Sequence, residues 1–149
     1  MEYSPIVARL RVAYEQWSAS KGQSIDCWLE LCAKQISIVA PGGDNPEIAF
    51  SKTRRGLPQV REYFGAILHE WRMNEFEMSD FIEDGNRVVA IGSCSWTHKR
   101  TDKRVNTPKI DVWTFEKGKA IRFCEFYDSA KVIAAATPER GTSTRDSSF

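Results

Sequence analysis

Hydrophobic and polar residues alternate over most of the second half of the chain, and a period of two is typical of a half-buried β-strand. The alternating segments are residues 75–83, 88–98, 105–115 and 120–127. Turn-forming residues separate them, with Gly85 between the first two segments and Gly118 between the last two. The second half is therefore predicted to form a long antiparallel meander.

The first half follows a helical period of apolar residues instead. Ser4 and Pro5 can start a first helix, Ser24 can cap a second, and Leu57 and Pro58 can start a third. The predicted inner stripes are Val7, Leu10, Tyr14 and Trp17; Trp28, Leu31 and Cys32; and Val60, Phe64, Ile67, Leu68 and Trp71. Each stripe needs a partner surface, so the helices are expected to pack against the sheet.

Shorter segments complete the chain. Residues 36–39 predict a strand, residues 44–55 an irregular segment with a short strand around residues 48–50, and residues 129–136 a closing helix. Because helices come first and strands later, the chain is predicted to be an α+β protein with its helices on one face of the sheet.

At 149 residues the chain fits a single domain. We assign residues 1–137 to that domain and residues 138–149, which are rich in Thr, Ser and Arg, to a flexible polar tail. The strand at residues 88–98 has apolar residues at both parities, so its outer face also needs a cover. A homodimer through this face would provide one, and a mixed core is the alternative.

The balance of basic and acidic residues limits the kinds of partner that the protein can bind. The sequence has 21 basic and 20 acidic residues, which argues against nucleic acid or an anionic membrane as the main partner. A basic cluster, Lys99, Arg100, Lys103 and Arg104, lies at a predicted hairpin tip and is interpreted as a solvated turn. The N-terminus lacks a signal-peptide layout and no apolar run reaches the roughly 20 residues that span a bilayer. We therefore expect a cytoplasmic protein.

The cysteines and histidines do not form a metal-binding pattern. Cysteines at positions 27, 32, 94 and 124 have no CxxC spacing, and His69 and His98 are far apart in sequence and both expected at the surface. No glycine-rich phosphate loop is present. The sequence predicts no metal and no organic cofactor, and it predicts buried free thiols in a reducing compartment.

An acidic residue stands inside an otherwise apolar predicted strand. Asp111 shares a face with Trp113 and Phe115. An ionised carboxylate among aromatic side chains is costly unless it is paired, hydrogen-bonded or protonated. This cost suggests a lined pocket in which the acid has a function.

A second acid is expected beside the first. If the chain turns tightly at residues 116–119, Asp111 pairs near Glu125 across the two strands, on the same face. Two carboxylates this close would share a proton and provide one acid and one base. The alternative is a structural pair bridged to Lys109 or Arg122.

The order of elements up to about residue 136 resembles the nuclear transport factor 2-like superfamily, and within it the SnoaL-like and ketosteroid isomerase-like proteins. The resemblance rests on residues 28–39, on residues 118–128, and on residues 56–64, which are similar to the family pattern Gly-x-x-x-Val/Ile-x-x-Phe/Tyr-Phe. It implies a cone-shaped, cystatin-like fold: a curved antiparallel sheet with three to four helices packed on its concave face. The superfamily includes isomerases, cyclases, hydrolases, dehydratases and non-catalytic binders, so the fold alone does not give the reaction.

The ketosteroid isomerase resemblance implies an oxyanion hole made by a helix tyrosine and a protonated aspartic acid on a late strand. The matching positions here are Tyr14 and Asp111. The position of the family's general base is Ala40, so the usual base is missing, and Asp44 is the one acid that could reach over the cavity mouth to replace it.

A second comparison is limonene-epoxide hydrolase, which shares the fold and activates water with an Asp-Arg-Asp arrangement. Glu125 matches the position of its last aspartate. The other two positions fall near Gly92 and Cys94, so the resemblance implies that this arrangement is absent.

The candidate catalytic residues are therefore Asp111 as acid or polariser, Tyr14 as hydrogen-bond donor and Glu125 as a second acid–base group. Aromatic residues that could wall a substrate cavity are Trp17, Trp28, Phe50, Phe64, Trp113, Phe123 and Tyr127. The alternative for Tyr14 and for these aromatic residues is that they simply fill the core.

Two functions follow from these residues. One is a cofactor-independent isomerase, cyclase or lyase that acts on a small hydrophobic carbonyl compound by acid–base chemistry. The other is a non-catalytic small-molecule-binding or dimeric interaction module of the same fold. The acid pair favours the first function, and Ala40 at the base position favours the second.

Overall fold

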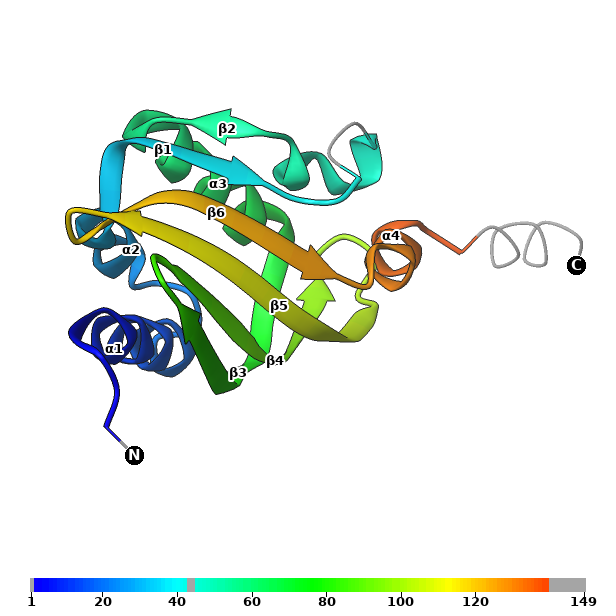
Figure 1. Ribbon diagram of the computed structural model, residues 1–149. Coiled ribbons are helices and arrows are strands. Elements are labelled where there is room, and N and C mark those ends of the chain that lie inside the picture. Colours follow the sequence, from blue (N-terminus) through cyan, green and yellow to red (C-terminus); the bar gives the residue numbers. More distant parts are fainter. Residues whose placement is uncertain (1, 43–44, 140–149) are drawn as a thin grey trace, which may run out of the picture.

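A single six-stranded sheet runs through the computed structural model, which describes residues 2–42 and 45–139. The strands, in the order in which they lie side by side, are β2 (Arg54–Arg55), β1 (Cys32–Val39), β6 (Lys119–Tyr127), β5 (Arg104–Glu116), β4 (Arg87–His98) and β3 (Trp71–Asp84). The helices are α1 (Pro5–Ala19), α2 (Ile25–Leu31), the 3₁₀ helix η1 (Pro46–Ser51), α3 (Leu57–Glu70) and α4 (Ser129–Ala136). Figure 1 shows the sheet curving around α1, α2 and α3. The predicted α+β class and cone-shaped fold are confirmed.

The meander β3–β6 forms as the alternation predicts, because its pairings are between neighbours in the sequence. The two tight hairpins turn at glycines in the left-handed region, with φ of 61° at Gly85 and 80° at Gly118. On β5, buried and exposed residues alternate, and Asp111 lies on the buried face with Trp113 and Phe115.

The predicted stripe residues are buried except Leu68, which is half-buried, and Cys32 belongs to β1 and not to α2. Ser4 caps α1 by accepting a hydrogen bond from the backbone N–H of Val7 at 3.2 Å. Trp71 is buried too, but it is the first residue of β3 and not part of α3, because its backbone is already extended. Across residues 2–42 and 45–139, none of the helices has the length and apolar character needed to cross a membrane.

Two features depart from the sequence patterns. The prediction of a strand at residues 48–50 is wrong, because Asn45 accepts a hydrogen bond from the N–H of Glu47 at 2.8 Å and Pro46 starts a 3₁₀ helix there. In addition, β1 begins at Cys32 and runs parallel to β6, with Ile38 opposite Phe123. All other strand pairs are antiparallel.

The curvature of the sheet depends on irregularities in β3. Its register against β4 shifts between Met73 and Glu75 and again between Met78 and Asp80, and such bulges bend a strand. Gly92 lies opposite the second irregularity, and a Cβ there would overlap the carbonyl oxygen of Glu77. A glycine at this position therefore lets β3 and β4 approach where the sheet bends.

The turn between β4 and β5 contains most of the predicted basic cluster, and its side chains bind the C-terminal end of α4. Lys103 donates to the carbonyl oxygen of Thr137 at 2.6 Å, and Arg100 donates to that of Ala136 at 3.2 Å. These cations meet the C-terminal end of a helix, where positive charge is favourable. Of the predicted polar tail, residues 140–149 lie outside the described residues.

Candidate functional site

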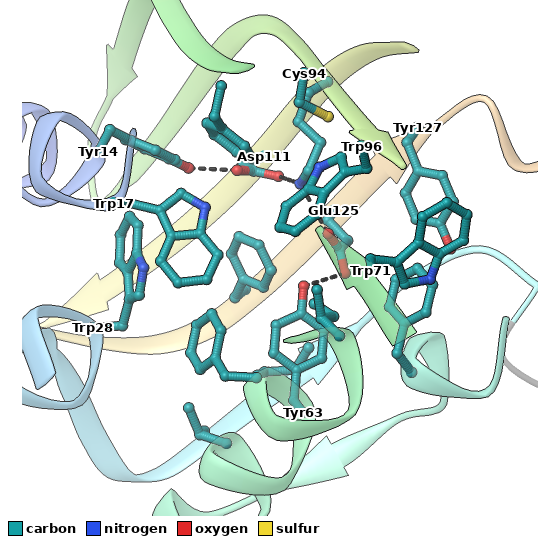
Figure 2. A pocket seen from close by; sticks show the side chains of 18 of the residues that line it. Tyr14, Trp17, Trp28, Tyr63, Trp71, Cys94, Trp96, Asp111, Glu125 and Tyr127 are labelled. Carbon is teal, nitrogen blue, oxygen red and sulfur yellow. Dashed lines mark hydrogen bonds and ion pairs between the residues drawn. The ribbon is translucent and has the colours of Figure 1, made fainter. Parts of the chain in front are cut away.

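The sheet and the helices on its concave side enclose a cavity lined mainly by aromatic and aliphatic side chains (Figure 2). The centres of water-sized spheres can occupy about 90 Å³ of it. One water needs roughly 10–15 Å³ on this measure, so the cavity has space for several waters or a small organic ligand. All predicted site residues lie on its wall: Tyr14, Trp17, Trp28, Phe50, Phe64, Asp111, Trp113, Phe123, Glu125 and Tyr127.

The lining residues that are partly exposed to solvent indicate where the cavity opens. Among the residues that line it, Phe50, Trp96 and Tyr127 are half-buried, and the others are buried. The ring of Phe50 stacks on that of Tyr127, with the ring centres 6.0 Å apart, and the hydroxyls of Ser51 and Tyr127 form a hydrogen bond. We expect a ligand to enter beside these two rings, near η1 and the end of β6.

The two predicted acids meet in the cavity. Asp111 on β5 is paired directly with Glu125 on β6, and the two residues are 1% and 2% exposed. The turn at Gly118 pairs Glu116 with Lys119, and this register alone would place Cys124 opposite Asp111. A register shift between Thr114 and Phe115 brings Glu125 opposite Asp111 instead. Two carboxylates at this depth require compensation.

Lys109 provides that compensation. It lies two residues before Asp111 on β5, on the same buried face. Its ammonium donates a hydrogen bond to Oδ1 of Asp111 and lies 2.8 Å from Oε1 of Glu125. One buried cation is therefore shared by two buried acids, which is the bridged pair that the sequence left open as an alternative to proton sharing.

Two tyrosines reach the acids from different helices, as Figure 2 shows. Tyr14 of α1 donates to Oδ2 of Asp111 at 2.5 Å, and Tyr63 of α3 donates to Oε2 of Glu125 at 2.6 Å. The indole N–H of Trp113 in turn donates to the Tyr14 hydroxyl at 2.9 Å. The result is one buried hydrogen-bonded chain along the cavity wall.

Burial and mutual contact shift the pKa values along this chain. Burial raises the pKa of the Asp111 carboxyl above its usual range, although the Lys109 ammonium works in the opposite direction. Burial alone would lower the pKa of Lys109, but Asp111 and Glu125 more than offset this and raise it. Burial followed by the nearby carboxylate raises the pKa of both Tyr14 and Tyr63, so both remain neutral donors.

The sequence patterns give Lys109 only as a possible bridge between the acids, and they miss Tyr63. The signal for Lys109 is the period of two, which puts it on the face of Asp111. Tyr63 gives a weaker signal, since it stands beside the predicted stripe residue Phe64 and only the packing of α3 on β6 brings it to Glu125. An acid–cation–acid arrangement therefore does form here, from Lys109 and not from residues near Gly92 and Cys94.

The structure places no acid at the position of the missing general base. Ala40 follows β1, and it does not line the cavity. Asp44, the acid considered as a replacement, lies outside the described residues. Within residues 2–42 and 45–139, the carboxylates on the cavity wall are those of Asp111 and Glu125.

The expectation that His98 is exposed is wrong. Its side chain is 2% exposed, because the β4–β5 turn folds over it and its Nδ1 accepts from the N–H groups of Arg100 and Thr101 at 3.3 and 3.4 Å. Trp71 packs edge-on against its ring. His98 thus supports the turn, whereas His69 is exposed as expected.

The cysteines are free thiols, and Cys32 and Cys94 line the cavity. Burial raises the pKa of Cys94 to about 11 and that of Cys32 to about 12, so both remain protonated at neutral pH. No cluster of three potential metal ligands occurs among the described histidines, cysteines and acids.

Solved structures of nuclear transport factor 2-like proteins share this fold, a curved sheet closed by helices. Within that class, the chain belongs to the SnoaL-like domain family, whose model matches residues 12–123. No curated protein matches the sequence.

Solved structures from several bacteria share the fold. An NTF2-like protein of unknown function from Burkholderia pseudomallei has a TM-score of 0.78 at 23% identity, covering 91% of this chain and 99% of its own. A Catenulispora acidiphila protein with a ketosteroid isomerase-like fold, solved with trimethylamine, has a TM-score of 0.70 at 13% identity, covering 93% and 96%. A candidate SnoaL-like polyketide cyclase from Mesorhizobium loti has a TM-score of 0.66 at 14% identity, covering 81% and 98%. At these identities the similarity concerns the fold.

Proposed function

We propose that the protein is a cofactor-independent enzyme that moves protons on a small hydrophobic carbonyl compound, as an isomerase, cyclase or lyase does. The observation that carries the proposal is the pair of buried carboxylates, Asp111 and Glu125, on one ammonium inside an aromatic cavity. A buried charge cluster of this kind is costly for a protein that needs only a filled core.

The two acids have different environments and therefore different proposed roles. Asp111 is the proposed proton donor, because burial raises the pKa of its carboxyl above the usual range. Glu125 is the base that accepts a proton from the carbon next to the substrate carbonyl, in place of the base missing at Ala40. Tyr14 and Tyr63 orient the two carboxyl groups through their hydrogen bonds.

The aromatic wall is the proposed binding surface for the apolar part of the substrate. Trp28 stacks on Trp113 with ring centres 5.6 Å apart, and Trp17 packs against Phe64 at 5.1 Å. Flat rings held in this way favour a flat or hydrophobic ligand and exclude water, which strengthens electrostatic interactions with the acids.

A thermal-shift screen tests this function. Steroid-like, terpenoid and polyketide-like carbonyl compounds would be screened against the wild type and Asp111→Asn in parallel. A ligand that binds only the native state stabilises it, by about 2.7 kcal/mol at a ligand concentration of one hundred times its Kd. This stabilisation raises the melting temperature. We expect hits that weaken in the variant; if no compound stabilises the wild type, the proposal is wrong.

The second candidate is a non-catalytic small-molecule binder of the same fold. It is favoured by the saturation of the polar chain, since both oxygens of Asp111 and Oε2 of Glu125 accept hydrogen bonds and Oε1 of Glu125 is in an ion pair with Lys109. A screen in which ligands bind equally well to the wild type and to Asp111→Asn, with no turnover by either protein, would favour the binder.

We also propose that the outer face of the sheet joins two copies of the chain. Apolar residues lie in register across it, with Ile91 opposite Ile110 and Ile110 opposite Phe126. Ile110 is 38% and Phe126 48% exposed in the single chain. A continuous apolar face of this kind is more typical of an interface than of a monomer surface.

Phe126→Lys is expected to convert a dimer into a monomer, because it places a charge in the centre of the proposed interface. Light scattering after size exclusion at micromolar concentration measures the mass. Val12→Lys is the matched control, since Val12 is 54% exposed on α1 and lies off the sheet. A monomeric wild type contradicts the proposal.

A further inference from the structure

Lys109 has one hydrogen-bond donor to spare. An ammonium carries three N–H groups. Asp111 accepts a hydrogen bond from it, Glu125 forms an ion pair with it at 2.8 Å, and no further acceptor occurs among the residues that the structure describes. Lys109 is 7% exposed and lines the cavity, with its Nζ 5.5 Å from the centre of the Phe123 ring on the same wall. The spare N–H is therefore available to a ligand in the cavity.

The Tyr14–Asp111 pair has no unused hydrogen-bond donor for a ligand. The Tyr14 hydroxyl donates to Asp111 and accepts from Trp113, so its single hydrogen is already used inside the wall. The hydroxyl of Tyr63 is used in the same way by Glu125. Of the polar groups in this buried chain, the one with an unused donor is Lys109.

We infer that Lys109 binds the oxygen of the substrate carbonyl and is a further catalytic residue of the site. The inference rests on the proposed function and names the group that polarises its substrate. When Glu125 accepts the proton from the carbon next to the carbonyl, the C–H electron pair forms a carbon–carbon double bond. The carbonyl oxygen gains the negative charge, and the ammonium that contacts it stabilises that charge.

The surroundings of Lys109 suit this role. Contact with two carboxylates holds the ammonium in place, so it needs no reorganisation when charge develops on the substrate. Its raised pKa keeps it protonated, and it therefore acts as a donor and not as a nucleophile. A neutral ligand with an acceptor oxygen is favoured over a protonated amine, which would meet a cation already in place.

Infrared spectroscopy of bound 2-tetralone, labelled with carbon-13 at its carbonyl, tests the inference. A hydrogen bond from an ammonium lowers the carbonyl stretching frequency relative to an apolar solvent. We expect this lowered frequency in the wild type and its loss in Lys109→Met. Lys109→Arg, which keeps a cationic donor, should retain part of the shift, and Lys131→Met, which changes an exposed lysine of α4, should retain all of it.

Affinities give a second readout that a merely structural lysine would not move. The wild type should bind 2-tetralone roughly tenfold or more tightly than tetralin, which has the same rings and no oxygen. Lys109→Met should bind the two equally. If that variant does not fold, the wild-type spectrum and affinity ratio still decide. A bound carbonyl with the frequency of an apolar solvent overturns the inference.

The outcomes separate this inference from the proposed function. If 2-tetralone exchanges its protons with solvent but its carbonyl frequency is unshifted, Lys109 is not the contact and the enzyme proposal stands. If the frequency is shifted but no proton exchanges, Lys109 is the contact and the enzyme proposal falls. A protein that binds neither 2-tetralone nor tetralin overturns both.

Discussion

Replacing Glu125 with Gln is expected to lower the rate of proton exchange at the carbon next to the carbonyl of 2-tetralone by roughly 10²–10⁴-fold, the usual contribution of a positioned acid or base. The amide keeps the shape of the side chain and can still accept a hydrogen bond from Tyr63, but it cannot take a proton. Asp111→Asn should reduce the rate as well, because the proton donor is lost. Exchange in D₂O, followed by NMR or mass spectrometry, measures both effects.

The single and double variants together show whether the acids act as one unit. If Asp111 and Glu125 serve the same proton transfer, the double variant should lose little more than the more severe single variant. Glu116→Gln is the matched control, because Glu116 is an exposed glutamate at the far end of β5 and should leave the rate unchanged. Exchange that persists in Glu125→Gln within about threefold of the wild-type rate, well below the effect expected for a lost base, would remove Glu125 from the mechanism.

Lys109→Met is expected to lower the free energy of unfolding by about 3–5 kcal/mol, the cost of breaking a buried ion pair by removing one partner. In the wild type the ammonium serves two buried carboxylates, so its loss leaves both without a cation. Urea unfolding followed by tryptophan fluorescence measures the loss. Lys131→Met, at an exposed position, should leave the free energy within about 0.5 kcal/mol of wild type.

The deficit of Lys109→Met should depend on pH. A carboxyl whose pKa in the folded protein lies above its unfolded value of about 3.9 contributes stability below that value, and this stability is lost as the pH rises through the folded-state pKa. The pKa of Asp111 is raised already, and removing the ammonium that lowers it raises it further. The difference between variant and wild type should therefore be largest near pH 7 and smallest near pH 4.

A compensating variant separates charge from packing. With Asp111→Asn and Glu125→Gln added to Lys109→Met, no uncompensated charge remains, and most of the lost stability should return, since neutral replacements of buried ion pairs are often tolerated. If the triple variant is as unstable as Lys109→Met alone, the lysine stabilises the protein through packing of its methylene groups.

Much of the fold could be predicted because the signals that carry it are local. The alternation along β3–β6 gives each strand its buried face, and the turn at Gly118 joins β5 to β6 so that Asp111 and Glu125 come close. Their direct pairing also needs the register shift between Thr114 and Phe115, which the alternation does not predict. The stripe from Val7 to Trp17 and the cap at Ser4 give α1 with its inner face. The aromatic residues predicted to wall a cavity do line one, because period and parity already decide which side chains point inward.

The tertiary structure decided what those inward side chains do to one another. The patterns cannot state that α3 brings Tyr63 to Glu125, that β1 lies parallel to β6, or that the β4–β5 turn buries His98, since each depends on the packing of segments distant in the sequence. They left the partner of the two acids open between proton sharing and a bridging cation. In the folded protein the partner is a bridging cation. Two carboxylates that are this completely desolvated are tolerated only when a positive charge and hydrogen-bond donors contact them. The folded chain provides both through Lys109 and the two tyrosines.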